Sequence, residues 1–160
     1  EFSSSIMCLI LAGKVGSNIA SELGTMRVTQ QIDALDIMGV NSAGYLIMPK
    51  ILGLMTLMPC LVIFADVMGV IGAYATAYIG HILSPEDLTL GLQHAFNPWF
   101  VWMSIIKSTV FAFIIASVSS FCGYTVEGGS VEVGKASTSA VVNSSILILF
   151  SDVFLTQLLS

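Results

Sequence analysis

The residues best suited to chemistry in this chain are charged side chains inside long apolar stretches. They are Lys14, Asp66, Lys107 and Asp152. A charge at the centre of a bilayer costs about 2.5–3.5 kcal/mol on insertion scales, so such residues need a partner or a role. One interpretation is structural, in which the charges pair or satisfy backbone groups inside a helix bundle. The other is functional, in which they line the path of a charged ligand or carry protons.

Two of these charges have candidate partners. Lys14 and Asn18 are four residues apart, and a helix would place both on one face. A cation on such a polar face attracts a phosphate group, so we expect Lys14 to face a ligand cavity. Lys107 and Asp152 carry opposite charges in different apolar stretches, which predicts an ion pair between two helices.

Other signatures of chemistry are weak. Residues 129–136 read GSVEVGKA and match the start of a phosphate-binding P-loop, but Ala136 lacks the hydroxyl that would hold Mg²⁺. We therefore expect a flexible glycine-rich loop there. Cys8, Cys60 and Cys122 form no CxxC pair, and the sequence contains neither HExxH nor GxSxG. We predict no catalytic centre, no metal site and no cofactor in this chain.

The composition shows what kind of element carries these residues. Of the 160 residues, 56% are hydrophobic and 9% are charged, with ten acidic and five basic side chains. A soluble domain carries about 25% charged residues, so this chain has too few to cover a globular surface. Lipid is the solvent that suits it. No basic stripe is present, so nucleic-acid binding is excluded.

Four stretches reach the length of about 20 apolar residues that a helix needs to cross a bilayer. They are residues 4–23, 51–80, 99–122 and 139–159. Backbone groups in lipid must be satisfied within the segment, so we expect helices. The predicted fold class is an all-α, polytopic membrane bundle with a single domain over residues 1–160. Pro59 predicts a kink in the second stretch.

The connections between the spans predict their orientation. Arg27 and Lys50 lie between the first two spans and Lys135 between the last two, whereas residues 81–98 contain no Lys or Arg. The positive-inside rule then places the first and last connections in the cytoplasm and the middle one outside. The Ser-Pro-Glu-Asp sequence in the outer connection is typical of a helix start and predicts a short helix over residues 85–94.

Residues 24–40, between the first two spans, differ from the rest. They read GTMRVTQQIDALDIMGV, in which Val28, Ile32 and Leu35 recur at helical spacing and Met38 extends the stripe. We predict an amphipathic helix on the cytoplasmic side. It either rests on lipid or docks onto a cytoplasmic partner. A lipid-resting helix favours Lys and Arg on its polar face, and this segment has one Arg.

Two long runs carry a resemblance to a known family. The run AGKVGSNIASELGTMRVTQQIDALDIMGV, residues 12–40, resembles the signature of the MlaE-type permeases, which are membrane subunits of ABC transporters that work with MCE-domain proteins. The run GYTVEGGSVEVGKASTSAVVNSSILILFSDVFLTQLL, residues 123–159, resembles the family's second signature. The resemblance covers nearly the whole chain.

The resemblance implies a homodimer with five spans per subunit, of which this chain would lack the first span and the interfacial helix before it. It implies that residues 24–40 are the coupling helix, docked on a cytoplasmic ABC ATPase that binds ATP and Mg²⁺. The family moves phospholipid between the bacterial inner membrane and a periplasmic MCE-domain protein, and this supports outer-membrane lipid asymmetry. Some relatives handle sterols or other lipids. The family often has Arg where this chain has Lys14, which keeps the charge without the planar fork.

On this basis we expect two groups of site residues. The predicted ATPase-coupling residues are Glu22, Arg27, Gln30, Asp33, Leu35 and Met38. The predicted lipid-path residues are Lys14, Asn18, Asp66, Lys107 and Asp152. The alternative function is a secondary transporter driven by an ion gradient, with Asp66 or Asp152 as the proton carrier. Such a carrier would not need a docking helix.

Overall fold

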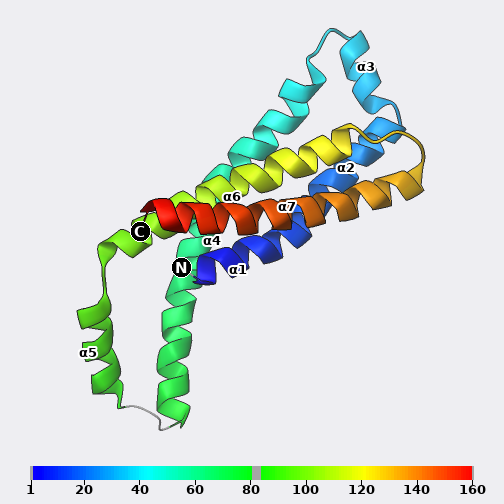
Figure 1. The fold of residues 1–160 in the computed structure, drawn as a ribbon. Coiled ribbons are helices and arrows are strands. Elements are labelled where there is room, and N and C mark those ends of the chain that lie inside the picture. Colours follow the sequence, from blue (N-terminus) through cyan, green and yellow to red (C-terminus); the bar gives the residue numbers. More distant parts are fainter. Residues whose placement is uncertain (1, 81–83, 160) are drawn as a thin grey trace.

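The computed structural model describes residues 2–80 and 84–159, and these form helices without any strand. In chain order the elements are α1 (Phe2–Leu11), η1 (Ala12–Gly16), α2 (Ser17–Val28), α3 (Gln31–Ile37), α4 (Ser42–Gly80), α5 (Pro85–Ala95), α6 (Pro98–Tyr124) and α7 (Ser130–Leu159) (Figure 1). The joined segment Phe2–Val28 and the helices α4, α6 and α7 are each long and apolar enough to cross a membrane. The predicted all-α, polytopic fold class is therefore confirmed.

Two helices begin well before the apolar stretches that predicted them. Helix α4 starts at Ser42 rather than residue 51, and α7 starts at Ser130 rather than residue 139. Hydropathy reports only the part of a helix that suits lipid, whereas backbone hydrogen bonds continue into polar sequence. The expectation of a flexible loop over residues 129–136 was wrong, because most of that segment forms the first turns of α7. There Lys135 donates to Glu132 at 2.8 Å, one helical turn away.

Helix α6 is the central helix of the bundle, because it packs against α4, α7 and α2. One part of the core is apolar and gathers residues from five elements: Cys8, Ala12, Met58, Val62, Phe111, Ala112, Ile115 and Ile148. Nearer the C-terminal end of α6, small residues let helices approach closely. A Cβ built on Gly123 would lie 2.6 Å from the carbonyl oxygen of Ala20, so α2 and α6 touch there backbone to backbone.

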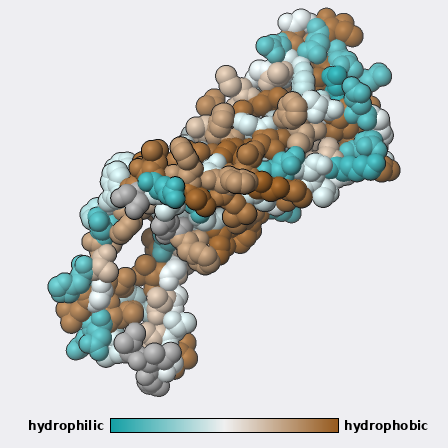
Figure 2. All heavy atoms as spheres, viewed as in Figure 1, coloured by the Kyte–Doolittle hydropathy of each residue, from teal (hydrophilic) through white to brown (hydrophobic). Residues whose placement is uncertain are grey.

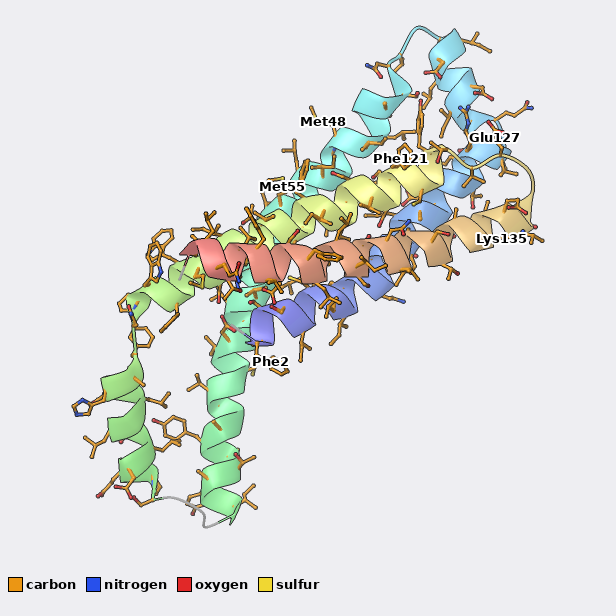
Figure 3. All side chains as sticks on the ribbon, viewed as in Figure 1. Phe2, Met48, Met55, Phe121, Glu127 and Lys135 are labelled. Atoms are coloured by element: carbon orange, nitrogen blue, oxygen red, sulfur yellow. The ribbon has the colours of Figure 1, made fainter. Side chains whose placement is uncertain are left out.

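The two ends of the bundle are chemically different. The α3 end consists of α3, the C-terminal ends of α2 and α6, and the first turns of α4 and α7 (Figure 1). Glu127 and Lys135 lie there, far from Phe2 (Figure 3). Hydrophobic atoms cover much of the visible bundle surface, and hydrophilic residues gather at the α3 end and around α5 (Figure 2). This distribution suits a molecule whose middle lies in lipid.

Helix α4 is longer than a bilayer span requires, with 39 residues. It stays helical through Pro49 and Pro59, and Figure 1 shows it bending near its middle, where it passes behind α7. Pro59 lies near that midpoint and lacks the N–H that would complete the helix ladder, which accounts for a bend. Beyond it, the C-terminal half of α4 and α5 lie away from the bundle. Residues 81–83, at the start of the predicted outer connection, are outside the described residues.

Candidate functional site

The segment predicted as one amphipathic helix over residues 24–40 is divided in the structure. Helix α2 continues to Val28, and α3 begins at Gln31 after a turn at Thr29 and Gln30. Gln30 has a φ of 61°, in the left-handed region that a continuous helix does not use. The Gln30 N–H donates to the carbonyl of Arg27 at 3.1 Å, only three residues back, so the α-helical bonding pattern of α2 ends there. The hydrophobic spacing is compatible with this break, which is why periodicity did not reveal it.

The far end of α3 is closed by a glycine. Gly39 has a φ of 78°, and its N–H donates to the carbonyl of Asp36 at 3.1 Å. The next N–H, from Val40, donates to the carbonyl of Leu35 at 3.1 Å. These bonds satisfy carbonyls at the end of α3, as a left-handed cap normally does. Helix α3 is therefore a short, capped element between two spans.

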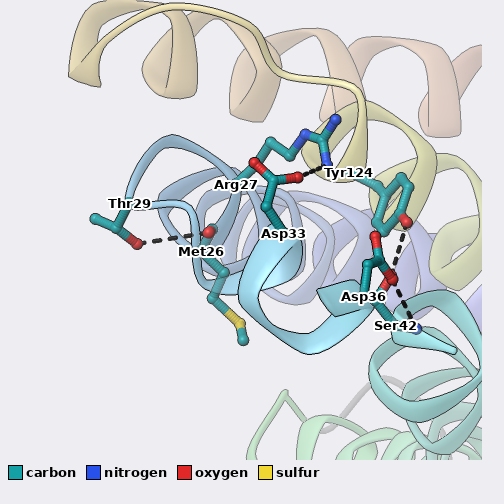
Figure 4. A network of polar contacts seen from close by, with 7 residues as sticks. All are labelled: Met26, Arg27, Thr29, Asp33, Asp36, Ser42 and Tyr124. Carbon is teal, nitrogen blue, oxygen red and sulfur yellow. Dashed lines mark hydrogen bonds and ion pairs between the residues drawn. The ribbon is translucent and has the colours of Figure 1, made fainter. Parts of the chain in front are cut away.

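Polar contacts fasten α3 to α2 and α4, and further contacts join those two helices to α6 (Figure 4). Arg27 of α2 donates to Asp33 of α3 at 3.0 Å. The Asp36 carboxylate accepts the backbone N–H of Ser42, the first residue of α4, at 3.4 Å. The hydroxyls of Ser42 and Tyr124 share a hydrogen bond of 2.9 Å. The Arg27 guanidinium also lies 5.6 Å from the centre of the Tyr124 ring, within the range of a cation–π contact.

Most of the predicted coupling residues are engaged inside the chain. Glu22 accepts a hydrogen bond from Lys50 at 2.6 Å, which joins α2 to α4. Arg27 and Asp33 pair with each other, and Leu35 is half-buried. Gln30 is exposed at the turn between α2 and α3. The paired residues thus organise the α3 end, while the side chains of Glu22 and Asp33 stay more than half exposed.

The exposed surface of α3 is polar at Gln31, Asp33 and Asp36 and ends in a pair of large apolar side chains. Ile37 is 87% exposed and Met38 is 68% exposed, next to each other at the end of α3. Ile32, on the opposite side, is completely buried and anchors the helix. Met38 was among the predicted coupling residues, but Ile37 was missed. The sequence signal for Ile37 was a large apolar residue that lies outside the predicted stripe of Val28, Ile32, Leu35 and Met38.

Lys107 and Asp152 form the predicted ion pair between α6 and α7. The Lys107 ammonium lies 3.1 Å from the Asp152 carboxylate and donates to the Thr156 hydroxyl at 2.6 Å. The side chain of Lys107 has no exposed area, whereas that of Asp152 is 27% exposed. A charge so enclosed and bonded fits the structural interpretation better than contact with a lipid.

Lys14 and Asn18 lie apart from that pair, exposed on the bundle surface. Lys14 belongs to η1, a π-helical turn, and such single turns inside α-helices are frequent at functional sites. The Ser17 hydroxyl donates to the Lys14 carbonyl at 3.2 Å, and Ser137 of α7 donates to the Ser17 carbonyl at 3.1 Å. The wide turn is thus held by bonds within the helix and from α7, and it presents the lysine outward.

Asp66 occupies a third position, on α4 opposite the start of α6. It is half-buried and lines an open cavity of about 250 Å³ with Phe96, Phe100 and Ser104. The described residues include no cation paired with it. The predicted lipid-path residues therefore do not converge on one site within a single chain: they form an exposed polar pair, a cavity carboxylate and a buried ion pair.

Comparison with known proteins gives one family and several relatives. The family model described as Permease MlaE matches residues 1–158. A probable ABC transporter permease protein of Rickettsia bellii is 46% identical over 151 residues, 94% of this chain and 58% of the relative. A probable ABC transporter permease protein of Synechocystis is 33% identical over 159 residues, 99% of this chain and 60% of the relative.

A plant protein also matches. The chloroplastic protein TRIGALACTOSYLDIACYLGLYCEROL 1 of Arabidopsis thaliana is 33% identical over 157 residues, 98% of this chain and 45% of the relative. The chain thus spans about half to three fifths of the length of these curated relatives. The family model covers both ends of the bundle, including α3 and the helices that hold it. This chain belongs to the MlaE permease family.

Proposed function

We propose that this chain is part of the permease subunit of an ABC transporter for phospholipids, and that α3 is the coupling helix that docks onto a cytoplasmic ATPase. The observation that carries the proposal is the exposed pair Ile37 and Met38 at the end of a short helix that is bonded to the spans on both sides of it, through α2 and α4. Large apolar side chains outside the lipid-facing surface suit burial against a protein partner. ATP and Mg²⁺ would be bound by that partner, and this chain would break no bonds.

A lipid cargo is supported by family membership and by the name of the Arabidopsis relative, which refers to a glycolipid. The exposed Lys14 and Asn18 would meet the phosphate of a headgroup, and apolar faces of the spans would meet the acyl chains. Two copies of the permease would enclose this path as a homodimer. The two-fold arrangement would then bring the Lys14 side chains of both copies to one cavity.

The wider setting that we propose is the one that the family resemblance implies. The permease would lie in the bacterial inner membrane and exchange lipid with a periplasmic MCE-domain protein, which would support outer-membrane lipid asymmetry. ATP-driven closure of the two ATPases would push on α3, and the attached spans would shift and expel lipid from the cavity. Related permeases for sterols or other lipids define the nearest alternative cargo.

The test is purification of the full-length permease from native membranes, followed by lipid extraction and an ATPase assay of the complex. We expect an ATPase, an MCE-domain protein and bound phospholipid to accompany it. A permease recovered alone, without ATPase activity, would contradict the proposal and favour the ion-driven carrier. Asp66 would then be the first residue to replace, because Asp152 is already paired with Lys107.

A further inference from the structure

The polar contacts at the α3 end form a closed circuit through four helices. From Arg27 of α2 the circuit runs to Asp33 of α3, and from Asp36 of the same helix to Ser42 of α4. Ser42 bonds Tyr124 of α6, whose ring lies beneath Arg27 and so returns to α2. Figure 4 shows these side chains converging between α3 and the ends of the spans.

The circuit matters because α3 is too short to transmit movement by itself. It has seven residues, and an isolated helix of that length is not stable in water. Gln30, directly before α3, and Gly39, two residues after it, both have positive φ. A push on Ile37 and Met38 would be absorbed by these bends unless other contacts tie α3 to the spans.

Tyr124 is the residue that extends the circuit to the centre of the bundle. It is the last residue of α6, the helix that packs against α4, α7 and α2. Toward its other end α6 carries Lys107, which is bonded to Asp152 of α7. Movement passed to Tyr124 therefore reaches α7 as well. Ser42 is 2% exposed and Tyr124 is half-buried, so their hydroxyl bond is partly shielded from competing water.

We propose that Tyr124 is a positioning residue for transport: with Ser42, it forms a latch that transmits movement of α3 to α6. The inference rests on the proposed function, since it assumes that an ATPase pushes on α3. It adds a residue on α6 that need not touch the ATPase or the lipid, and whose hydroxyl nevertheless determines how much lipid moves for each ATP hydrolysed.

The experiment uses full-length permease in complex with its ATPase, in vesicles of phosphatidylethanolamine and phosphatidylglycerol with a fluorescent phosphatidylethanolamine probe. Tyr124→Phe removes the hydroxyl and keeps the ring beneath Arg27, and Ser42→Ala removes the other partner. Tyr45→Phe is the matched control: it removes a tyrosine hydroxyl from the first turn of α4, and no described residue bonds that hydroxyl. Lipid transferred and ATP hydrolysed are measured together.

We expect Tyr124→Phe and Ser42→Ala each to lower the lipid moved per ATP by about three- to tenfold, the effect of one hydrogen bond. The double variant should be no worse than either single one, because both remove the same bond. ATPase co-purification should be unchanged, and Tyr45→Phe should behave as wild type. Tyr124→Phe and Ser42→Ala variants that keep the wild-type ratio would overturn the latch while leaving the proposed function in place.

Two further outcomes separate the latch from simpler explanations. A drop in transport matched by an equal drop in ATP hydrolysis, with a lowered unfolding temperature, would show a structural bond and overturn the latch. Wild-type permease that binds no ATPase would overturn the proposed function and the latch together. If Tyr124→Phe does not assemble, the ratio measured for Ser42→Ala decides, since it breaks the same bond from the side of α4.

Discussion

Lys107 shows how a charged residue is accommodated inside an apolar bundle. Its ammonium has no exposed area, and it is held by the Asp152 carboxylate and the Thr156 hydroxyl. Thr156 in turn donates to the backbone carbonyl of Asp152 at 2.6 Å. This bond orients the hydroxyl that accepts from Lys107. Removing one member leaves the other charge without its partner, whereas removing both charges leaves only a change of shape.

The pair is therefore expected to show a non-additive double-mutant cycle. Lys107→Met and Asp152→Asn should each lower the free energy of unfolding by about 3 kcal/mol, with a smaller loss where the partly exposed Asp152 is the charge left behind. The double variant should be more stable than either single variant. Denaturant unfolding of the purified permease in detergent measures all three. A loss in the double variant equal to the sum of the two single losses would show that the two residues act independently.

Lys14 is also a charged residue in an apolar span, but its environment differs from that of Lys107. It is exposed on a π-helical turn, where a phosphate can reach it. Lys14→Ala should lower phospholipid transport by about tenfold or more, the effect of one charge-assisted hydrogen bond, while Lys14→Arg keeps most of it. Lys135→Ala, at an exposed lysine of the α3 end, is the control. Full transport by a well-folded Lys14→Ala permease would remove Lys14 from the lipid path.

Among the elements, α3 presents the clearest partner surface. Ile37→Asp or Met38→Asp should lower ATPase co-purification by about tenfold or more, because burying such a side chain contributes about 1.5–3 kcal/mol. Val131→Asp is the matched control, since Val131 is 70% exposed at the same end but lies on α7. Equal effects of the α3 variants and of Val131→Asp would indicate a general loss of folding. No effect of Ile37→Asp and Met38→Asp would place the ATPase contact elsewhere.

The approach of α2 to α6 depends on Gly123. A Cβ there would meet the Ala20 carbonyl at 2.6 Å and the Leu23 Cβ at 2.9 Å, both on parts of the chain that cannot rotate away. Gly123→Ala should destabilise the bundle by about 1–3 kcal/mol. Gly134→Ala on α7 is the control, because a Cβ there meets nothing within 4 Å, and alanine favours helix by about 1 kcal/mol. Thermal unfolding in detergent compares them, and equal stability of the two variants would contradict the close contact.

At the scale of the whole molecule, the two hydrophilic ends predict opposite sides of the membrane (Figure 2). Full-length permease lacking its native cysteines would receive Glu86→Cys on α5 or Lys135→Cys at the α3 end. A membrane-impermeant maleimide should label Glu86→Cys in intact spheroplasts and Lys135→Cys only after permeabilisation, because basic residues gather at the α3 end. The reverse pattern would invert the orientation and remove α3 from the cytoplasm.

The amino-acid sequence alone determined the all-helical membrane fold and the family resemblance, and it indicated Lys107 and Asp152 as a candidate ion pair. Partition into lipid depends on composition along the chain, and opposite charges in apolar helices strongly favour meeting each other. These properties can be assessed without knowing how the helices are arranged.

Only the tertiary structure decided how residues 24–40 are arranged. The break at Gln30 is a change of backbone conformation that periodicity does not record, and the exposure of Ile37 depends on which side of α3 packs with Ile32. The bond between Ser42 and Tyr124 joins residues 82 positions apart. Hydropathy predicts that a helix meets lipid or protein, but not which neighbour each face meets. The packing of helices around α6 decides which neighbour each face meets, and this packing connects α3 to the spans.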